Sequence, residues 1–184
     1  MARVHSTMVP LGSPVPEFRL PDTVSGREIS ISEIRGSVAT VIMFICNHCP
    51  FVVHVNPELV KLAADYLGRG IGFLAISAND VITHPDDAPD KMKEQAVLMG
   101  YPFPYCYDKT QDVARAFDAA CTPDFFIYDS SDRLVYRGQL DDSRPGNGIP
   151  VTGYDIRRAL NCLLSGQPVP GDQHPSIGCN VKWK

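Results

Sequence analysis

The stretch VATVIMFICNHCP, residues 38–50, constrains the fold more than any other part of the chain. Its first part, residues 38–45, is a nearly continuous apolar run rich in β-branched side chains, which predicts a strand buried on both faces of a sheet. Beyond the cysteines, apolar residues recur at spacings of three and four, which predicts a helix. These residues are Leu59, Leu62, Ala63, Tyr66 and Leu67. A Cys-x-x-Cys pair, Cys46 and Cys49, therefore stands where a buried strand gives way to a helix.

The rest of the chain supplies the remaining layers of the fold. Short alternating runs flank the turn PDTVSG and predict an N-terminal hairpin. Residues 71–77 form a second apolar strand, and residues 124–140 carry two β-rich runs around the turn DSSD. Helical patterns end near Gly100 and span residues 110–119 and 152–166. The sequence thus alternates strands and helices and closes with a hairpin and a helix.

This order predicts an α/β fold in one domain over residues 1–184. The strand–helix–strand unit implies a parallel pair with a right-handed crossover, and the late hairpin adds antiparallel strands. We expect a mixed central sheet with helices on both faces and an N-terminal β-hairpin extension. Residues 1–17 are predicted to form an extended arm, and residues 167–184 an irregular tail.

Composition excludes several kinds of partner. The formal net charge is -4, and no cluster of Lys and Arg forms a basic face, so we expect no nucleic-acid partner. No segment approaches the roughly 20 apolar residues that span a bilayer, so we expect no membrane association. The N-terminus lacks the apolar stretch of a secretory signal, and we expect a cytoplasmic protein. In that compartment a close cysteine pair is more often catalytic or metal-binding than structural.

The position of the pair predicts redox chemistry. We expect Cys46 to open the helix, where unpaired N–H groups and the helix dipole stabilise a thiolate. Cys49 would lie one turn later, with its own thiolate less favoured. The thiolate is the attacking species in disulfide exchange, so Cys46 is predicted to attack and Cys49 to resolve the mixed disulfide.

The other cysteines leave alternatives open. A zinc site usually has four ligands and a second close pair, but the remaining cysteines stand alone, so no metal site is predicted. Cys121, two residues before Pro123, is either a third redox thiol or a small buried residue. Cys179, in the tail, is either an additional resolving cysteine or an inert thiol.

Two motifs resemble the thioredoxin superfamily. VATVIMFICNHCPF is similar to the strand, C-x-x-C motif and helix of that fold, and CTPDFFIYD is similar to its cis-proline segment. The resemblance implies a thioredoxin-like three-layer sandwich. It also implies a cis peptide bond between Thr122 and Pro123, which would align substrate beside the sulfur atoms.

Further segments resemble peroxiredoxin-like proteins. LGSPVPEFRLPD is similar to the entry of AhpC/TSA domains, those of alkyl hydroperoxide reductases and thiol-specific antioxidants. YRGQLDDSRPG and PSIGCNVKWK are similar to a bacterial subfamily of peroxiredoxin-like thiol-disulfide oxidoreductases. Peroxiredoxins, however, carry P-x-x-x-[TS]-x-x-C, and the matching positions here hold Ala39 and Met43.

The motif also departs from thioredoxin. Where thioredoxin has a Trp and a buried Asp, this chain has Ile45 and Thr40. His48 occupies the place of the histidine in C-x-H-C oxidases and isomerases. The resemblance implies that His48 stabilises the Cys46 thiolate and raises the reduction potential above that of thioredoxin.

These observations predict a thiol-disulfide oxidoreductase that acts through Cys46 and Cys49. Its partners would be protein or small-molecule disulfides and thiols, with an upstream thiol reductant and no dissociable cofactor. One alternative is a thiol peroxidase with Cys46 as the peroxidatic cysteine. A second is a redox sensor or metal chaperone that uses the same pair.

Overall fold

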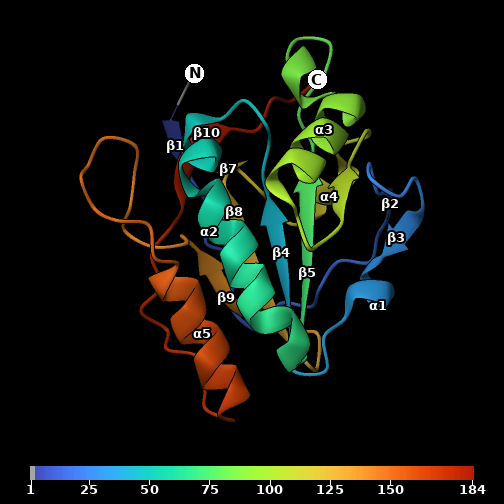
Figure 1. Cartoon of the computed structure of the whole chain (residues 1–184). Coiled ribbons are helices and arrows are strands. Elements are labelled where there is room, and N and C mark those ends of the chain that lie inside the picture. Colours follow the sequence, from blue (N-terminus) through green and yellow to red (C-terminus); the bar gives the residue numbers. More distant parts are fainter. Residues whose placement is uncertain (1–2) are drawn as a thin grey trace.

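A central five-stranded sheet organises the molecule, for which a computed structural model describes residues 3–184 (Figure 1). In sheet order the strands are β6 (Tyr105–Tyr107), β5 (Ile71–Ser77), β4 (Ala39–Phe44), β8 (Asp124–Asp129) and β9 (Leu134–Gly138). The first three run parallel, whereas β8 is antiparallel to both β4 and β9. This mixed sheet is the one predicted, with the late hairpin adding the antiparallel strands.

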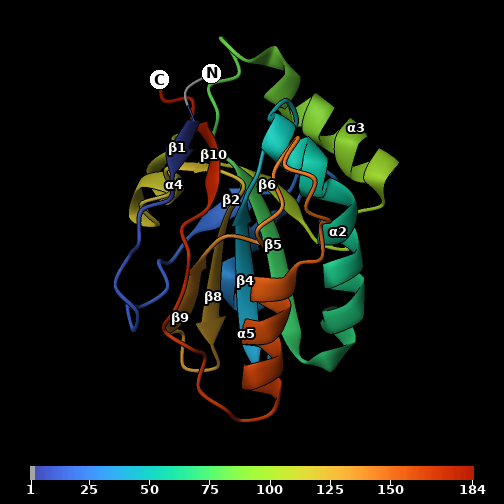
Figure 2. The same ribbon diagram turned by 90° about the vertical axis from the view of Figure 1, so that its left-hand side faces the viewer.

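Helices cover both faces of the sheet, so the structure has three layers. Figure 2 shows α2 and α4 on opposite sides of the strands. One face carries α2 (Pro50–Tyr66), α3 (Pro89–Met99) and α5 (Tyr154–Leu164). The other carries α4 (Asp112–Ala116), the short α1 (Ile31–Ile34) and the hairpin of β2 (Arg19–Pro21) and β3 (Glu28–Ser30). Two 3-10 turns, η1 (Leu67–Arg69) and η2 (Pro85–Asp87), complete the connections.

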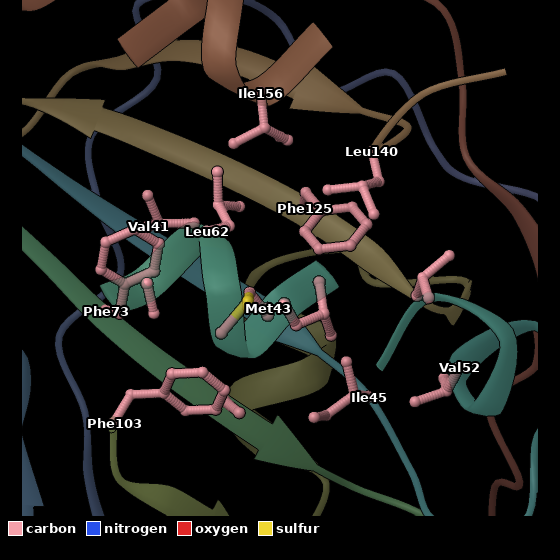
Figure 3. Close-up of a cluster of buried hydrophobic side chains, with 14 of the residues drawn as sticks. Val41, Met43, Ile45, Val52, Leu62, Phe73, Phe103, Phe125, Leu140 and Ile156 are labelled. Atoms are coloured by element: carbon pink, nitrogen blue, oxygen red, sulfur yellow. The ribbon is translucent and has the colours of Figure 1, made fainter. Parts of the chain in front are cut away.

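The central strand β4 explains the apolar run of the sequence. Successive side chains of a strand point to opposite faces, so Val41 and Met43 enter the core beneath α2, while Ile42 and Phe44 enter the other core. Every residue of β4 is buried. Figure 3 shows Val41 and Met43 in a cluster with Leu62 of α2 and with residues of the neighbouring strands and helices.

The predicted irregular tail is wrong for residues 177–180, which form a strand that pairs with the extended N-terminal arm. Residues Ile177–Asn180 form β10, which pairs with β1 (Arg3–His5) on one side and with β7 (Cys121–Thr122) on the other. Figure 2 shows β1 and β10 side by side. These strands are short, and their partners lie far away in sequence, so no local alternation of apolar and polar residues reveals them.

Helix α2 starts later than predicted. Strand β4 ends at Phe44, and the helix begins only at Pro50, with Cys49 as the residue before its first turn. Proline suits the first helical position but pushes the preceding residue into an extended conformation. Cys49 accordingly has φ -71° and ψ 121°. The expected helix start at Cys46 is therefore incompatible with Pro50.

Within residues 3–184, none of the helices combines the length and apolar character needed to cross a bilayer.

Candidate redox site

The structure brings together four of the sequence-predicted residues. Cys46 and Cys49 lie between the end of β4 and the start of α2, and Thr122 and Pro123 lie between β7 and β8. The Sγ of Cys46 is 3.3 Å from the Thr122 hydroxyl oxygen, and the Cys49 thiol donates to the Thr122 carbonyl oxygen at 3.2 Å. The Thr122–Pro123 peptide bond is cis. Thr122 thus contacts both sulfur atoms.

The two cysteines differ in accessibility. Cys46 retains 2% of its exposed surface and Cys49 retains none. All six cysteines are free thiols in this structure. Both cysteines are thus buried, and Cys46 is only slightly the more exposed residue.

The expected order of acidity is reversed. A hydrogen bond to Cys49, burial, and the nearby charge of Asp87 raise the pKa of Cys46 well above its ordinary value. Hydrogen bonds to the Cys49 sulfur, first from Cys46 and then from Cys179, lower the pKa of Cys49 despite its burial. The late helix start explains part of this reversal, because Cys49 and not Cys46 lies at the end of the helix where the backbone of Val52 can donate. The two thiols interact so closely that they titrate as a pair.

His48 lies beside the pair but is bound to a residue that the sequence did not single out. Its Nδ1 is 2.6 Å from a carboxylate oxygen of Asp87, which is fully buried at the end of η2. The sequence offered only an acidic, proline-bearing loop at this point, which is the composition of an exposed turn. No local pattern in residues 78–90 indicates that one of these acids turns inward.

Cys179 and Cys121 both lie close to the pair. The Cys179 thiol contacts the Cys49 sulfur, and burial and this contact raise the pKa of Cys179 to about 12. Strand β10 places Cys179 opposite Thr122. Cys121 is buried, donates to the carbonyl oxygen of Pro123 at 3.6 Å, and has its pKa raised by burial. Cys179 is therefore held by a strand and not by a mobile tail, while Cys121 has the surroundings of a core residue.

The site also contains donor atoms that a metal ion could use. One atom each of Cys46, His48 and Asp87 lies within 4.8 Å of the others. The oxygens of Asp87 already accept hydrogen bonds, from the backbone of Asn47 and from the side chain of Asn79 among others. A cation would have to displace these bonds, so the present arrangement favours a hydrogen-bonded network over a preformed metal centre.

The layers and the position of the cysteine pair define a thioredoxin-like protein. A solved structure of the thioredoxin domain of a thiol-disulfide oxidoreductase from Bacteroides vulgatus has a TM-score of 0.61 at 17% identity, covering 73% of this chain and 91% of that one. At this low identity the likeness concerns the fold.

The chain belongs to the AhpC/TSA family, whose sequence profile matches residues 11–137. Two solved structures are much more similar. An uncharacterized conserved protein from Geobacillus kaustophilus is 58% identical with a TM-score of 0.99, covering 100% of this chain and 97% of that one. A hypothetical protein from Sinorhizobium meliloti is 46% identical with a TM-score of 0.95, covering 98% of both chains. No curated protein matches.

Proposed function

We propose that the protein is a thiol-disulfide oxidoreductase that works through exchange at Cys46 and Cys49. Family membership indicates an oxidoreductase in general. The observation that carries the specific proposal is the contact of the two sulfur atoms with each other and with Thr122. A dithiol in such contact closes to a disulfide with little movement, which is the requirement for exchange.

The reaction has two steps. Cys46, which is slightly more exposed than Cys49, attacks a disulfide of the partner and forms a mixed disulfide, and one sulfur of the partner leaves. Cys49 then attacks the Cys46 sulfur, closes the internal disulfide and releases the second sulfur of the partner as a thiol. The reverse sequence oxidises a partner dithiol. An upstream thiol must supply electrons when the protein acts as a reductant.

A small cavity with a volume of about 10 Å³ lies beside the site. Residues from four separate segments line it next to Pro123. They include Phe51, Val55, Leu140, Arg144 and Ile177. The cavity is too small for a substrate, but Phe51 and Ile177 are apolar and partly exposed, so the surface beside Pro123 suits a polypeptide or an organic disulfide. We therefore propose protein or small-molecule disulfides as substrates.

Turnover of a disulfide substrate tests the proposal. Cys46→Ser is expected to abolish reduction of insulin and of glutathione disulfide, because the attacking sulfur is lost. Cys49→Ser is expected to accumulate the mixed disulfide, which mass spectrometry detects, and to trap partners in cells. Cys162→Ser, a change on α5 outside the site, is the control and should retain activity. Full activity of Cys46→Ser would refute the proposal.

The reduction potential supplies a second measurement. With His48 beside Cys46, we propose a potential above the roughly -270 mV of thioredoxin. Equilibration of the Cys46–Cys49 pair with glutathione buffers gives this value. A potential at or below that of thioredoxin would contradict the role of His48.

Thiol peroxidase activity is the second candidate, favoured by membership of the AhpC/TSA family. Cys46 would be oxidised to a sulfenic acid and resolved by Cys49. At the positions where peroxiredoxins carry Pro and Thr or Ser, Ala39 and Met43 are fully buried and apolar, so the nearest hydroxyl to Cys46 is that of Thr122. Peroxide consumption with a thiol donor, compared with disulfide reduction under the same conditions, decides between the two activities.

A further inference from the structure

Asp87 is a buried carboxylate that accepts hydrogen bonds from the loop between the two cysteines. One of its oxygens accepts the backbone N–H groups of Asn47 at 2.8 Å and of His48 at 3.3 Å. The other oxygen accepts the side-chain amide of Asn79 at 2.8 Å and lies 2.6 Å from Nδ1 of His48. An ionised carboxylate only accepts hydrogen bonds, so the N–H groups of Asn47, His48 and Asn79 match that state, and Nδ1 of His48 must then donate as well.

This arrangement determines which nitrogen of His48 is available. Because Nδ1–H donates to Asp87, the lone pair of the neutral ring lies on Nε2. Nε2 is buried and has no hydrogen-bond partner among residues 3–184. The ring of His84 stacks on that of His48, with centroids 5.0 Å apart and planes 26° apart. The imidazole is therefore held in one orientation with a free basic nitrogen.

Cys46 lies close to both His48 and Asp87. Its sulfur lies within 4.8 Å of a ring nitrogen of His48 and of an oxygen of Asp87. The loop amides that could have stabilised a Cys46 thiolate are instead bound to Asp87. The other titratable groups whose charge is felt here are Cys49, Tyr101 and Tyr105. Cys46 thus rests as a thiol and needs a base when it attacks.

We propose that Asp87 is a positioning residue that makes His48 the general base for Cys46, an inference that rests on the proposed exchange reaction. As the Cys46 sulfur bonds to a sulfur of the substrate, its proton passes to Nε2 of His48 through a bridging water, because Nε2 makes no hydrogen bond to the sulfur in this structure, and Asp87 neutralises the imidazolium. The substrate S–S bond breaks, its electron pair leaves with the second sulfur, and that sulfur takes the proton from Nε2 and departs as a thiol.

Asp87→Asn separates this role from mere support of the loop. The asparagine oxygen can still accept the loop amides, but its NH₂ group would donate to Nδ1 and move the ring proton to Nε2. Reduction of the neutral bis(2-hydroxyethyl) disulfide should fall by about 10-fold or more. Alkylation of Cys46 by iodoacetamide near neutral pH should instead become several-fold faster, because the negative charge is gone.

Controls keep these two results interpretable. Asp86→Asn changes the exposed neighbour of Asp87 and should alter neither rate. Cys121 should stay unreactive to iodoacetamide in every variant, which excludes faster alkylation through unfolding. A parallel fall of both rates in Asp87→Asn, or no change in exchange, would overturn the proposal.

The double variant Asp87→Asn/His48→Gln tests whether Asp87 acts through His48. If it does, the double variant loses no more exchange activity than His48→Gln alone. Independent, multiplying losses would show that Asp87 acts by another route. Wild-type protein that exchanges no disulfide would refute the proposed function itself, whereas exchange that survives Asp87→Asn refutes only the role of Asp87.

A measurement on the wild-type protein needs no folded variant at position 87. Nitrogen-15 NMR of the histidine rings distinguishes the two neutral tautomers, and the signal missing from His48→Gln identifies His48. We expect a proton on Nδ1 in the reduced protein. A neutral ring protonated only on Nε2 would overturn the proposal.

Discussion

Thr122 contacts the two sulfur atoms through two different groups. Its hydroxyl contacts Cys46 at 3.3 Å, and its carbonyl oxygen accepts from the Cys49 thiol at 3.2 Å. The hydroxyl contact lowers the pKa of Cys46 and so opposes the effects of burial and of Asp87. A single side-chain oxygen thus supports the thiolate that must form on Cys46 during attack.

Removing that hydroxyl gives the first prediction. Thr122→Val keeps the shape of the side chain, and we expect the pKa of Cys46 to rise further and its alkylation to slow several-fold. The pH dependence of iodoacetamide labelling measures both. Thr122→Ser retains the hydroxyl and should behave like wild type. Equal rates in the valine and wild-type proteins would show that the hydroxyl does not stabilise the thiolate.

Asp124, the residue after Pro123, has surroundings that disfavour its charged form. It is fully buried, one of its oxygens accepts the N–H of Phe125 at 3.1 Å, and the other has no close hydrogen-bond partner among residues 3–184. Burial raises the pKa of Asp124 well above its usual value. The side chain is therefore held as a neutral acid in the folded protein.

The second prediction follows from this raised pKa. An acid with a higher pKa in the folded than in the unfolded state binds its proton more tightly when folded. Its stabilising effect is complete below the unfolded value and is lost as pH rises toward the folded value. Asp124→Asn should remove this decline. Urea midpoints of the two proteins between about pH 4 and about pH 8 should therefore diverge in favour of the variant as pH rises.

At the scale of elements, the backbone of β10 packs tightly against Thr122 of the site. A Cβ added to Gly178 would lie 2.6 Å from the carbonyl carbon of Thr122, closer than such atoms approach. The strand can therefore pair with β7 only because this position carries no side chain.

Gly178→Ala gives the third prediction. The methyl group must push β10 away from β7, and we expect a loss of about 2 kcal/mol or more in the free energy of unfolding. We also expect faster alkylation of Cys49, since its neighbour Cys179 moves with the strand. Gly171→Ala is the matched control, because nothing lies within 4 Å of a Cβ there. Equal urea midpoints for the two variants would contradict this account.

A helix or strand can be predicted from the sequence when the pattern that determines it lies within its own residues. The apolar run 38–45 indicated β4, and the spacing of Leu59, Leu62 and Tyr66 indicated α2, because burial imposes a period on neighbouring residues. Strand β10 shows no such period, since its four residues depend on β1 and β7 at distant positions of the chain.

The same distinction applies to the site. Cys46, Cys49 and Thr122 came from motifs with fixed spacing. Asp87 comes from a loop whose fold brings it back to the C-x-x-C segment, and no pattern within the loop encodes that contact. The expected acidity of Cys46 failed because one residue, Pro50, moved the helix start.

For the whole molecule, Cys46 and Cys49 make the stability of the reduced protein depend on pH. In the reduced protein the pKa of Cys49 is lowered and that of Cys46 is raised relative to the pKa of a free thiol. The lowered pKa adds stability as pH rises through the folded value of Cys49, up to its unfolded value. The raised pKa removes stability once pH exceeds the unfolded value of Cys46.

The fourth prediction is therefore a maximum in the stability of the reduced protein. Urea midpoints should rise with pH below about 9 and fall above it, after subtraction of the values for Cys46→Ser/Cys49→Ser, which lacks the titrating pair. A difference that does not vary with pH would contradict the opposed shifts of the two thiols.

The position of β10 also has a consequence for the nascent chain. Residues 177–180 leave the ribosome after every other part of the site has been made, yet Cys179 borders Cys49 and pairs opposite Thr122. Until β10 inserts beside β7, the inner cysteine lacks this neighbour and lies open to oxidants and to wrong partners. The redox centre is therefore complete only after residues 177–180, its last part in chain order, have been made and have paired with β7.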